Sequence, residues 1–192
     1  MGGFEAVVDE NQKKHHGHVC YIDGVECLAD EYRFGGIVIE AKSTTINFYS
    51  LNKPYGYFSN FARYPIDLKG SIWPTSEHYF QGQKFPGTLD EEELRGAVTP
   101  MIAAQMGRER KRPLRHDWDE VKDSVMRDAL YAKFTQHSDL KEKLLGTKDA
   151  TLVEHTANDS YWGDGGDGTG TNMLGTLLME IRERIRRENS ES

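Results

Sequence analysis

Apolar side chains recur every three or four residues in the second half of the chain, which is the period of an amphipathic helix. The longest such pattern begins at about residue 172 and puts one apolar stripe on a terminal helix: Leu174, Leu177, Leu178, Ile181 and Ile185. We expect this stripe to be buried and the chain from Arg182 onward to fray into solvent.

Capping residues mark four further helices in this half. Thr, Ser and Asp side chains accept hydrogen bonds from the free N–H groups of a first helical turn, and glycine commonly ends a helix. Asp117 with Glu120 fits a capping box, and Pro100 after Thr99 fits a first helical position. The predicted helices span about residues 76–85 (capped by Thr75 or Ser76), 100–106, 118–132 and 138–145.

Strand signals are short and lie mostly in the first half. Residues 19–22 and 25–28 flank Asp23-Gly24, a dipeptide typical of two-residue hairpin turns, and counting outward from the turn pairs Cys20 with Cys27. Further strands are predicted at residues 36–40, 46–50 and 152–155, and a small hairpin at residues 66–72.

Between these strands, residues 51–74 interleave aromatic residues with glycine, asparagine and proline. No helical period survives there, so we expect a loop held by its own aromatic side chains, which is a common place for a binding surface. Together the elements predict a helix-rich α+β fold with a few short strands at its edge.

Composition excludes several classes of protein. The 192 residues include 24 Lys or Arg and 31 Asp or Glu, and the formal net charge of −7 argues against a protein that coats nucleic acid through bulk positive charge. No apolar run has the length of a membrane span, and residues 1–9 lack the pattern of a secretory signal. Two cysteines do not make a disulfide scaffold. We therefore expect an intracellular, cytoplasmic protein that does not bind membranes.

A glycine-rich segment precedes the terminal helix. Residues 163–170 contain five glycines, and Trp162, Asp164 and Asn172 flank or interrupt them. Backbone N–H groups at a helix N-terminus attract anions, so a ligand-binding loop is one interpretation and a flexible turn is the other. The spacing satisfies G-x-G-x-x-G, but no apolar strand precedes it and a single helix follows, which argues against a dinucleotide-binding fold.

One predicted helix places three functional groups on one face. Glu77, Gln81 and Lys84 are four and three residues apart, and their neighbours Tyr79 and Phe80 indicate that the helix is largely buried. A carboxylate and an amine on a half-buried face have perturbed protonation, which catalysis can exploit. A structural salt bridge is the alternative.

Aromatic and basic residues supply two further candidate sites. Trp118 with Lys122, and Trp162 beside acidic residues, fit the stacking of a ring on a sugar or purine, although a tryptophan is more often core. Five Lys or Arg residues lie among residues 108–115 with only Glu109 opposing them. They fit a phosphate-contacting patch or, equally, a solvated basic turn.

A series of ordered motifs resembles those of the YbiA-like, or NADAR, family. They are Phe48-Tyr49-Ser50, Pro54-Tyr55-Gly56, Phe58-Ser59-Asn60-Phe61, residues 73–81, Gln83-Lys84-Phe85, Gly107-Arg108, Arg115-His116-Asp117-Trp118, Val121-Lys122, Lys133-Phe134, Asn158-Asp159, and residues 162–165 and 170–175. The resemblance covers about residues 46–187 and implies one compact, helix-rich α+β domain. It leaves residues 1–18 as a mobile arm, residues 19–45 as a β-hairpin and strand extension, and residues 188–192 as a frayed tail.

The resemblance also implies a function. Members of the family are associated with N-glycosidase activity on the bond between a ribose anomeric carbon and an exocyclic amine. One branch acts on phosphoribosyl-aminopyrimidine intermediates of riboflavin biosynthesis, and another removes ADP-ribose from guanine in nucleic acid. No metal and no cofactor are expected.

Roles carry over to residues that match the family motifs. Glu77 is expected as the acid/base group and Asp159 as the second carboxylate. Lys84 is a candidate nucleophile that captures the opened sugar aldehyde as an imine, or else a group that only holds Glu77 or a phosphate. Substrate contacts are expected from Tyr49, Gly56, Phe58, Ser59, Asn60, Arg108, Arg115, Trp118, Lys122, Trp162, Gly163, Asp164 and Asn172.

The basic residues at 108–115 favour one of these two substrates over the other. They favour ADP-ribosyl-guanine over the aminopyrimidine, with ADP-ribosylated DNA or RNA as a partner held through this local patch. The alternative from another class is a non-catalytic reader of ADP-ribose or a nucleotide that uses the same pocket. No sequence feature sets an oligomeric state.

Overall fold

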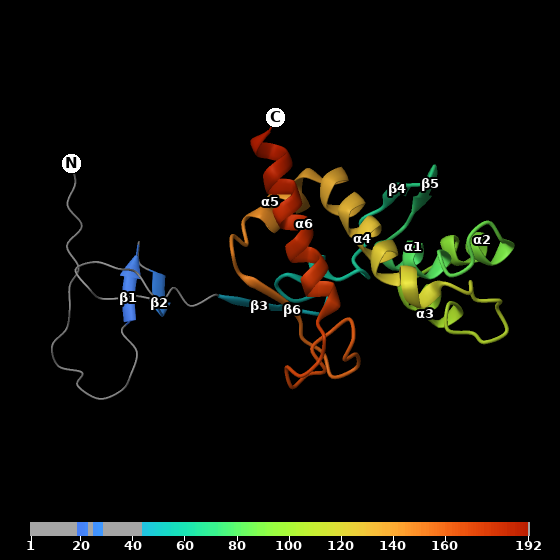
Figure 1. The fold of residues 1–192 in the computed structure, drawn as a ribbon, viewed down its shortest axis with the longest axis horizontal. Coiled ribbons are helices and arrows are strands. Elements are labelled where there is room, and N and C mark those ends of the chain that lie inside the picture. Colours follow the sequence, from blue (N-terminus) through green and yellow to red (C-terminus); the bar gives the residue numbers. More distant parts are fainter. Residues whose placement is uncertain (1–18, 23–24, 29–43, 192) are drawn as a thin grey trace. The chain divides into compact units, whose positions relative to one another are not determined.

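The computed structural model describes residues 44–191 and the backbone of residues 19–22 and 25–28, and the chain divides into two units at Thr44. In the first unit β1 (Val19–Ile22) and β2 (Val25–Leu28) form an antiparallel hairpin (Figure 1). Its register pairs Cys20 with Cys27, which confirms the prediction from the sequence. The predicted arm at 1–18, the turn at 23–24 and the strand at 36–40 lie outside the described residues.

The second unit is a helix-rich α+β domain, as predicted. Its elements are β3 (Thr45–Phe48), a 3₁₀ turn (Gly56–Phe58), β4 (Ile66–Leu68), β5 (Ser71–Trp73), α1 (Ser76–Gly82), α2 (Leu89–Arg95), α3 (Pro100–Met106), α4 (Trp118–Gln136), α5 (Ser138–Leu145), β6 (Thr151–Glu154) and α6 (Met173–Ser190). The sequence did not predict α2, because this acidic helix buries a single apolar residue, Leu94. None of the helices within residues 44–191 combines the length and apolar content needed to cross a membrane.

Helix starts follow the predicted caps with one exception. The hydroxyls of Thr75 and Thr99 accept hydrogen bonds from the N–H groups of the third helical residue, and Thr88 does the same for α2. Asp117 does not cap α4, so the predicted capping box is wrong. Its carboxylate instead accepts two hydrogen bonds from the Arg115 guanidinium, at 2.6 and 2.8 Å.

The core forms around α4, which packs against α1, α5, α6 and β4 (Figure 1). The predicted apolar stripe of α6 is buried throughout. The predicted fraying is wrong, because α6 continues to Ser190. Arg182 is buried and donates to Thr147 Oγ1 and the carbonyl of Ala150, both at 2.8 Å. Helix α6 therefore stays ordered by burying one arginine with its hydrogen bonds satisfied.

Two parallel strands join a segment near the start of the domain sequence to one near its end. β3 pairs with β6 so that Phe48 lies opposite Glu154. Helix α6 packs closely on β6 because Gly175 leaves no Cβ to overlap the carbonyl of Leu152. Asn172, in the left-handed region at φ 52°, accepts from the Glu154 N–H and donates to the Leu152 carbonyl. The end of β6 is thus fixed to the start of α6.

A buried lysine ties α4 to the aromatic loop. Lys133 is 0% exposed, and its ammonium donates to the carbonyls of Tyr57 and Ser59 at 2.7 and 2.9 Å. Desolvation lowers the pKa of Lys133 to about 7, because no carboxylate lies close enough to favour its charge. These two bonds hold the loop that carries Ser59 and Asn60.

Replacing Lys133 with methionine keeps the length of the side chain but leaves two buried carbonyls without donors. We expect Lys133→Met to lower the free energy of unfolding by roughly 2 kcal/mol or more, measured by chemical denaturation. The folded pKa lies below the unfolded one, so the wild type gains stability relative to Lys133→Met as pH rises from about 7. The exposed Lys53→Met is the control and should change stability little; an equal effect of both variants would contradict this role.

Candidate functional site

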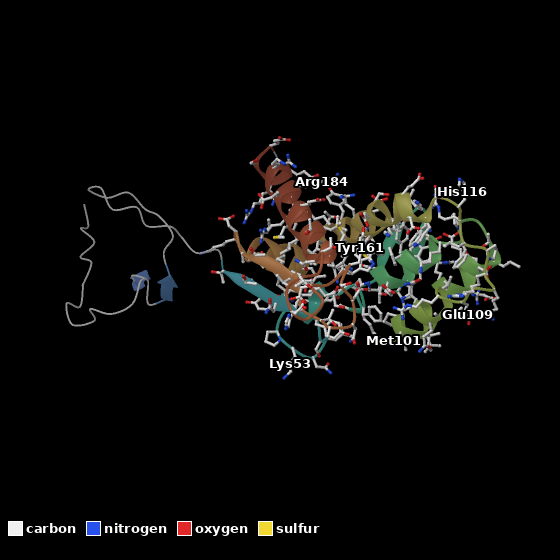
Figure 2. The ribbon with its side chains drawn as sticks, turned by 60° about the horizontal axis from the view of Figure 1, so that its bottom comes forward. Lys53, Met101, Glu109, His116, Tyr161 and Arg184 are labelled. Atoms are coloured by element: carbon white, nitrogen blue, oxygen red, sulfur yellow. The ribbon has the colours of Figure 1, made fainter. Side chains whose placement is uncertain are left out.

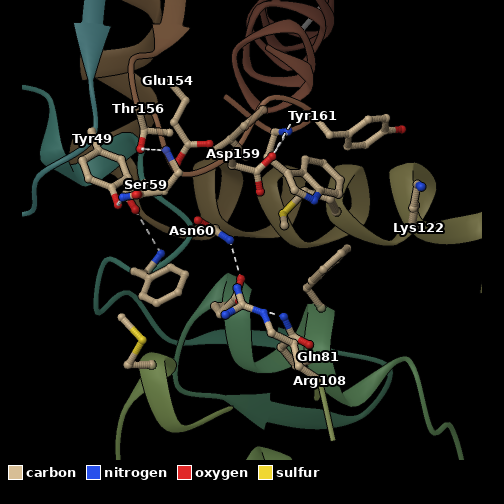
Figure 3. A pocket seen from close by; sticks show the side chains of 18 of the residues that line it. Tyr49, Ser59, Asn60, Gln81, Arg108, Lys122, Glu154, Thr156, Asp159 and Tyr161 are labelled. Atoms are coloured by element: carbon tan, nitrogen blue, oxygen red, sulfur yellow. Dashed lines mark hydrogen bonds between the residues drawn. The ribbon is translucent and has the colours of Figure 1, made fainter. Parts of the chain in front are cut away.

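A cavity of about 800 Å³ opens between the aromatic loop, α1, the start of α4 and the segment after β6 (Figure 3). Most of the predicted site residues line it: Glu77, Lys84, Asp159, Tyr49, Ser59, Asn60, Arg108, Trp118, Lys122 and Trp162. These residues are far apart in the sequence, so the fold assembles the site that the motifs indicated.

Glu77 lies in the first turn of α1 and is 3% exposed. The Asn60 amide donates to Oε2, the Gln81 amide donates to Oε1 at 2.7 Å, and the Glu77 N–H donates to the Asn60 carbonyl at 3.0 Å (Figure 3). Burial raises the pKa of Glu77 to about 7, although both amides and the positive charges of Lys84 and Arg108 act against this shift. At neutral pH this carboxyl can therefore both accept and release a proton.

Position 107 requires glycine, because the side chain of Gln81 occupies the space that a Cβ would need. The Gln81 Oε1 atom is buried without a hydrogen-bond partner among the described residues, and a Cβ on Gly107 would overlap it. The Gly107 carbonyl accepts from Lys84 Nζ at 3.1 Å. One glycine thus gives room to the residue that holds Glu77 and anchors the cavity's lysine.

The Lys84 ammonium lies among aromatic rings rather than in an ion pair. It is 5.4 Å from the Trp118 ring centroid and 5.8 Å from that of Phe80. Burial lowers the pKa of Lys84, and Arg108 adds to this effect, while the Glu77 charge opposes it. A larger share of neutral amine makes Lys84 a better nucleophile than a solvated lysine.

An aromatic cluster forms one wall of the cavity. Phe80 contacts Trp118 and Trp162 at centroid distances of 5.0 and 5.2 Å, both edge to face. The ammonium of Lys122 lies 4.5 Å from the Tyr161 ring centroid and donates to Asp119 Oδ1 at 3.1 Å. The tryptophans therefore serve both the core and the cavity surface, which joins the two interpretations that the sequence left open.

Two carboxyl groups enter the cavity from the segment that ends and follows β6. Asp159 Oδ1 accepts from the N–H groups of Tyr161 and Trp162, both at 2.8 Å, which fixes its direction (Figure 3). Glu154, at the end of β6, is 7% exposed, and its carboxyl has no hydrogen bond or ion pair to a described residue. Burial raises the pKa of Glu154 to about 7, and the charges of Asp159, Glu77 and Asp164 add to the shift.

Sequence reasoning missed Glu154. The sequence did contain a signal for its burial: Glu154 is two residues after the apolar Leu152 in a predicted strand, so both side chains lie on the same face. The other lining residues that were not predicted are Ser50, Leu51, Phe61, Phe80, Met101, Asp119, Met126, Thr156, Asn158, Tyr161 and Leu174. Gln81, which the helical spacing placed on the face of Glu77, lines the cavity too. Among the described residues, no three His, Cys, Asp or Glu side chains gather in a way that could hold a metal ion.

Three of the predicted substrate contacts instead shape the chain near the site. Gly56 lies against the carbonyl of Ser50, where a Cβ would come within 2.5 Å. Phe58 is 0% exposed and packs edge to face on Phe48. Arg115 pairs with Asp117, so its guanidinium is not among the groups that line the cavity.

The predicted glycine loop is also structural. Asp164 accepts from the N–H groups of Thr156 and Gly166 and from the His155 ring, and these bonds lower its pKa. Gly163 lies against the Glu154 carbonyl, where a Cβ would come within 2.8 Å, and Asn172 joins β6 to α6. Gly163, Asp164 and Asn172 are outside the cavity lining, so their positions give no support to the expected contacts with ribose or phosphate.

The basic residues at 108–115 are largely neutralised by acidic neighbours. The side chain of Arg112 is 8% exposed and forms ion pairs with Asp90, Glu93 and Glu109. The Nζ atom of Lys111 also pairs with Glu109 Oε2, at 3.1 Å. Glu109 lies at the α3 end of the domain (Figure 2). Arg108 lines the cavity. The ion pairs of this segment therefore mainly hold it against α2, and Arg108 is the cation of the segment that lines the cavity.

Comparisons with known proteins agree with this arrangement. The NADAR domain family matches residues 47–186. The chain is 58% identical over 144 residues to the N-glycosidase YbiA of Escherichia coli, and this match covers 75% of the chain and 90% of that protein. It is 47% identical over 145 residues to an N-glycosidase of Nostoc punctiforme, with 74% and 93% covered.

Two further comparisons extend this result. The chain is 41% identical over 140 residues to a riboflavin biosynthesis protein of Vibrio vulnificus, covering 73% of this chain and 38% of that protein. The NMR structure of E. coli YbiA superposes with a TM-score of 0.73 at 57% identity and covers 78% of this chain and 89% of that one.

The buried carboxyl of Glu154 predicts a pH-dependent cost in stability. The folded protein retains its proton up to about pH 7, whereas an unfolded glutamate loses it near pH 4.5, so this group lowers stability as pH rises through that window. We expect Glu154→Gln to be more stable than wild type by roughly 1–3 kcal/mol at pH 8 and nearly equal at pH 4. The exposed Glu142→Gln is the control. Parallel pH profiles of Glu154→Gln and wild type in denaturant unfolding would contradict the prediction.

Proposed function

The chain belongs to the NADAR domain family, and we propose that it is an N-glycosidase that hydrolyses the bond between a ribose anomeric carbon and an exocyclic amine. The observation that carries the proposal is the convergence of Glu77, Lys84 and Asp159 beside two tryptophans in one cavity. Relatives named N-glycosidases at 58% and 47% identity support it.

The chemistry of this bond matches the groups in the cavity. Its cleavage builds positive charge at the anomeric carbon, which a nearby carboxylate such as Asp159 stabilises. Glu77 can exchange protons near neutral pH, as a general acid or base must. Trp118 and Trp162 offer ring surfaces for the base or the sugar. Water is the only co-reactant, so the reaction needs no cofactor.

Lys84 offers a covalent route to the same products. When the sugar ring opens, C1 forms an imine with the exocyclic nitrogen, and the amine of Lys84 can add to this carbon. The exocyclic nitrogen takes a proton and leaves with the bonding electron pair, so that the sugar stays on Lys84 as an imine, and water then hydrolyses this imine to release the sugar aldehyde and the free lysine. The lowered pKa of Lys84 and its place among Phe80 and Trp118 support this role. In the alternative, Lys84 binds a phosphate and water attacks directly.

The charges in the cavity favour a small phosphoribosyl substrate over ADP-ribosyl-guanine. The expectation of a nucleic-acid substrate depended on the cations at 108–115, but Arg112 and Lys111 pair with acidic residues. Arg108 and Lys84 remain at the cavity without an ion pair to any described residue, which suits one phosphate. We therefore place phosphoribosyl-aminopyrimidines first, and a riboflavin biosynthesis protein among the relatives supports this choice. Removal of ADP-ribose from guanine is the alternative.

Incubation with each substrate followed by mass spectrometry of the products tests the proposal. We expect wild type to release the amine and ribose 5-phosphate from the aminopyrimidine faster than ADP-ribose from ADP-ribosyl-guanosine. Glu77→Gln should lower kcat about 10²–10⁴-fold while substrate still binds. Faster release of ADP-ribose would select the alternative substrate. Binding of ADP-ribose or nucleotide without turnover of either substrate would identify a non-catalytic reader and overturn the proposal.

Trapping with borohydride separates the two roles of Lys84. Reduction of an imine during turnover should leave a stable adduct of the opened sugar on Lys84, located by peptide mass spectrometry. We expect no adduct in Lys84→Arg and an unchanged adduct in Lys122→Arg, whose lysine also lines the cavity. A wild type that turns over under these conditions without forming an adduct would assign the attack to water.

A further inference from the structure

The carboxyl of Glu154 is a buried polar group that the fold leaves without a partner. It is 7% exposed and lines the cavity, and within residues 44–191 nothing donates to it or pairs with it. Its backbone is held instead: the N–H donates to Asn172 Oδ1 and the carbonyl accepts from the Asp164 N–H at 3.0 Å. A carboxyl that is fixed by its backbone and left unsatisfied at its tip is placed for a ligand rather than for stability.

Glu77 and Glu154 differ in what surrounds them. Both oxygens of Glu77 accept hydrogen bonds from amides, and the positive charges of Lys84 and Arg108 act on it. The charges that act on Glu154 are all negative, from Asp159, Glu77 and Asp164. The His155 ring bonds to Asp164 Oδ2, at 2.7 Å. The surroundings of Glu154 therefore favour its protonated form, as a proton donor needs, while the amides and positive charges around Glu77 favour its carboxylate, as a base needs.

Resting on the N-glycosidase function proposed above, we propose that Glu154 is the general acid that protonates the leaving nitrogen, and that Glu77 is the base for the attacking nucleophile. Figure 3 shows Glu154 and Asp159 on one side of the pocket and Gln81 and Arg108 on the other, with Asn60 between them. A sugar bound between the two sides would have one carboxyl available for its leaving group and another for its nucleophile.

The proton and electron balance of this step is complete. As the bond from the anomeric carbon to nitrogen breaks, its electron pair stays on nitrogen, which takes the proton of Glu154. The oxygen of water bonds to the anomeric carbon and gives its proton to Glu77. Glu154 ends as a carboxylate and Glu77 as an acid, and exchange with solvent restores both. When Lys84 attacks instead of water, the leaving nitrogen needs the same proton from Glu154.

A series of ribosyl 5-phosphate arylamines with leaving amines of different basicity tests the assignment. A general acid makes the rate nearly independent of leaving-group basicity, because the enzyme supplies the proton. We expect a shallow dependence of kcat/KM on amine pKa in wild type and a steep one in Glu154→Gln, with a loss of about 10²–10⁴-fold for the most basic amine and little loss for the least basic. Glu77→Gln should lower all members by a similar factor and keep the shallow dependence.

Controls and further variants make each outcome decisive. Glu142→Gln, an exposed substitution, should match wild type. Glu154→Asp, which keeps the acid but moves it away from the leaving nitrogen, should show a smaller loss than Glu154→Gln and a slope steeper than that of wild type. Equal slopes in wild type and folded Glu154→Gln would overturn the role of Glu154 alone. If Glu154→Gln does not fold, a steep slope in Glu154→Asp supports the role and a wild-type slope overturns it. A wild type that releases no amine from any member would overturn the N-glycosidase proposal itself.

Discussion

The buried ammonium of Lys133 connects the fold to the site. It stands on the central helix α4 and donates to the carbonyls of Tyr57 and Ser59, and the next residue, Asn60, holds Glu77 through its amide and its carbonyl. A loop without regular structure would otherwise leave these carbonyls buried and unpaired. The position of the Glu77 carboxyl in α1 thus depends on a buried lysine of the neighbouring helix α4, and not on α1 alone.

The same desolvation that costs stability gives the cavity its reactivity. Burial raises the pKa of Glu77 and Glu154 to about 7 and lowers that of Lys84. In water each group would hold its ordinary charge, and none would exchange protons efficiently at neutral pH. A cavity without these groups would make a more stable protein and a less reactive one, which is the usual relation between an active site and the fold that holds it.

Sequence patterns predicted local structure well and the site in part. Helical spacing put Glu77 and Gln81 on one face of α1, and capping residues located the start of α3, because both signals act within one or two turns. The helix ends at Gly82, earlier than the predicted residue 85, so Lys84 lies in the segment that follows α1. The ligand-binding role expected of the glycine segment gains no support from the structure, because a loop that binds an anion and a loop that folds around Asp164 have the same composition. Glu154 was missed because β6 is covered by α6, which packs closely on it at Gly175, and no local pattern contains this contact between distant segments.

Charge along the sequence and charge in space point to different substrates. The five cations at 108–115 suggest a surface for a phosphate backbone, yet Arg112 forms ion pairs with Asp90, Glu93 and Glu109, which come from α2 and the turn itself. Pairing of this kind cancels the field that would attract a polyanion. Arg108 and Lys84 line the cavity, and burial partly desolvates Lys84, so its charge acts on an anion there more strongly than it would on an open surface. The proposed preference for a small anionic ligand therefore rests on the place of Arg108 and Lys84 in the cavity, where neither forms an ion pair with a described residue, and not on how many cations the segment contains.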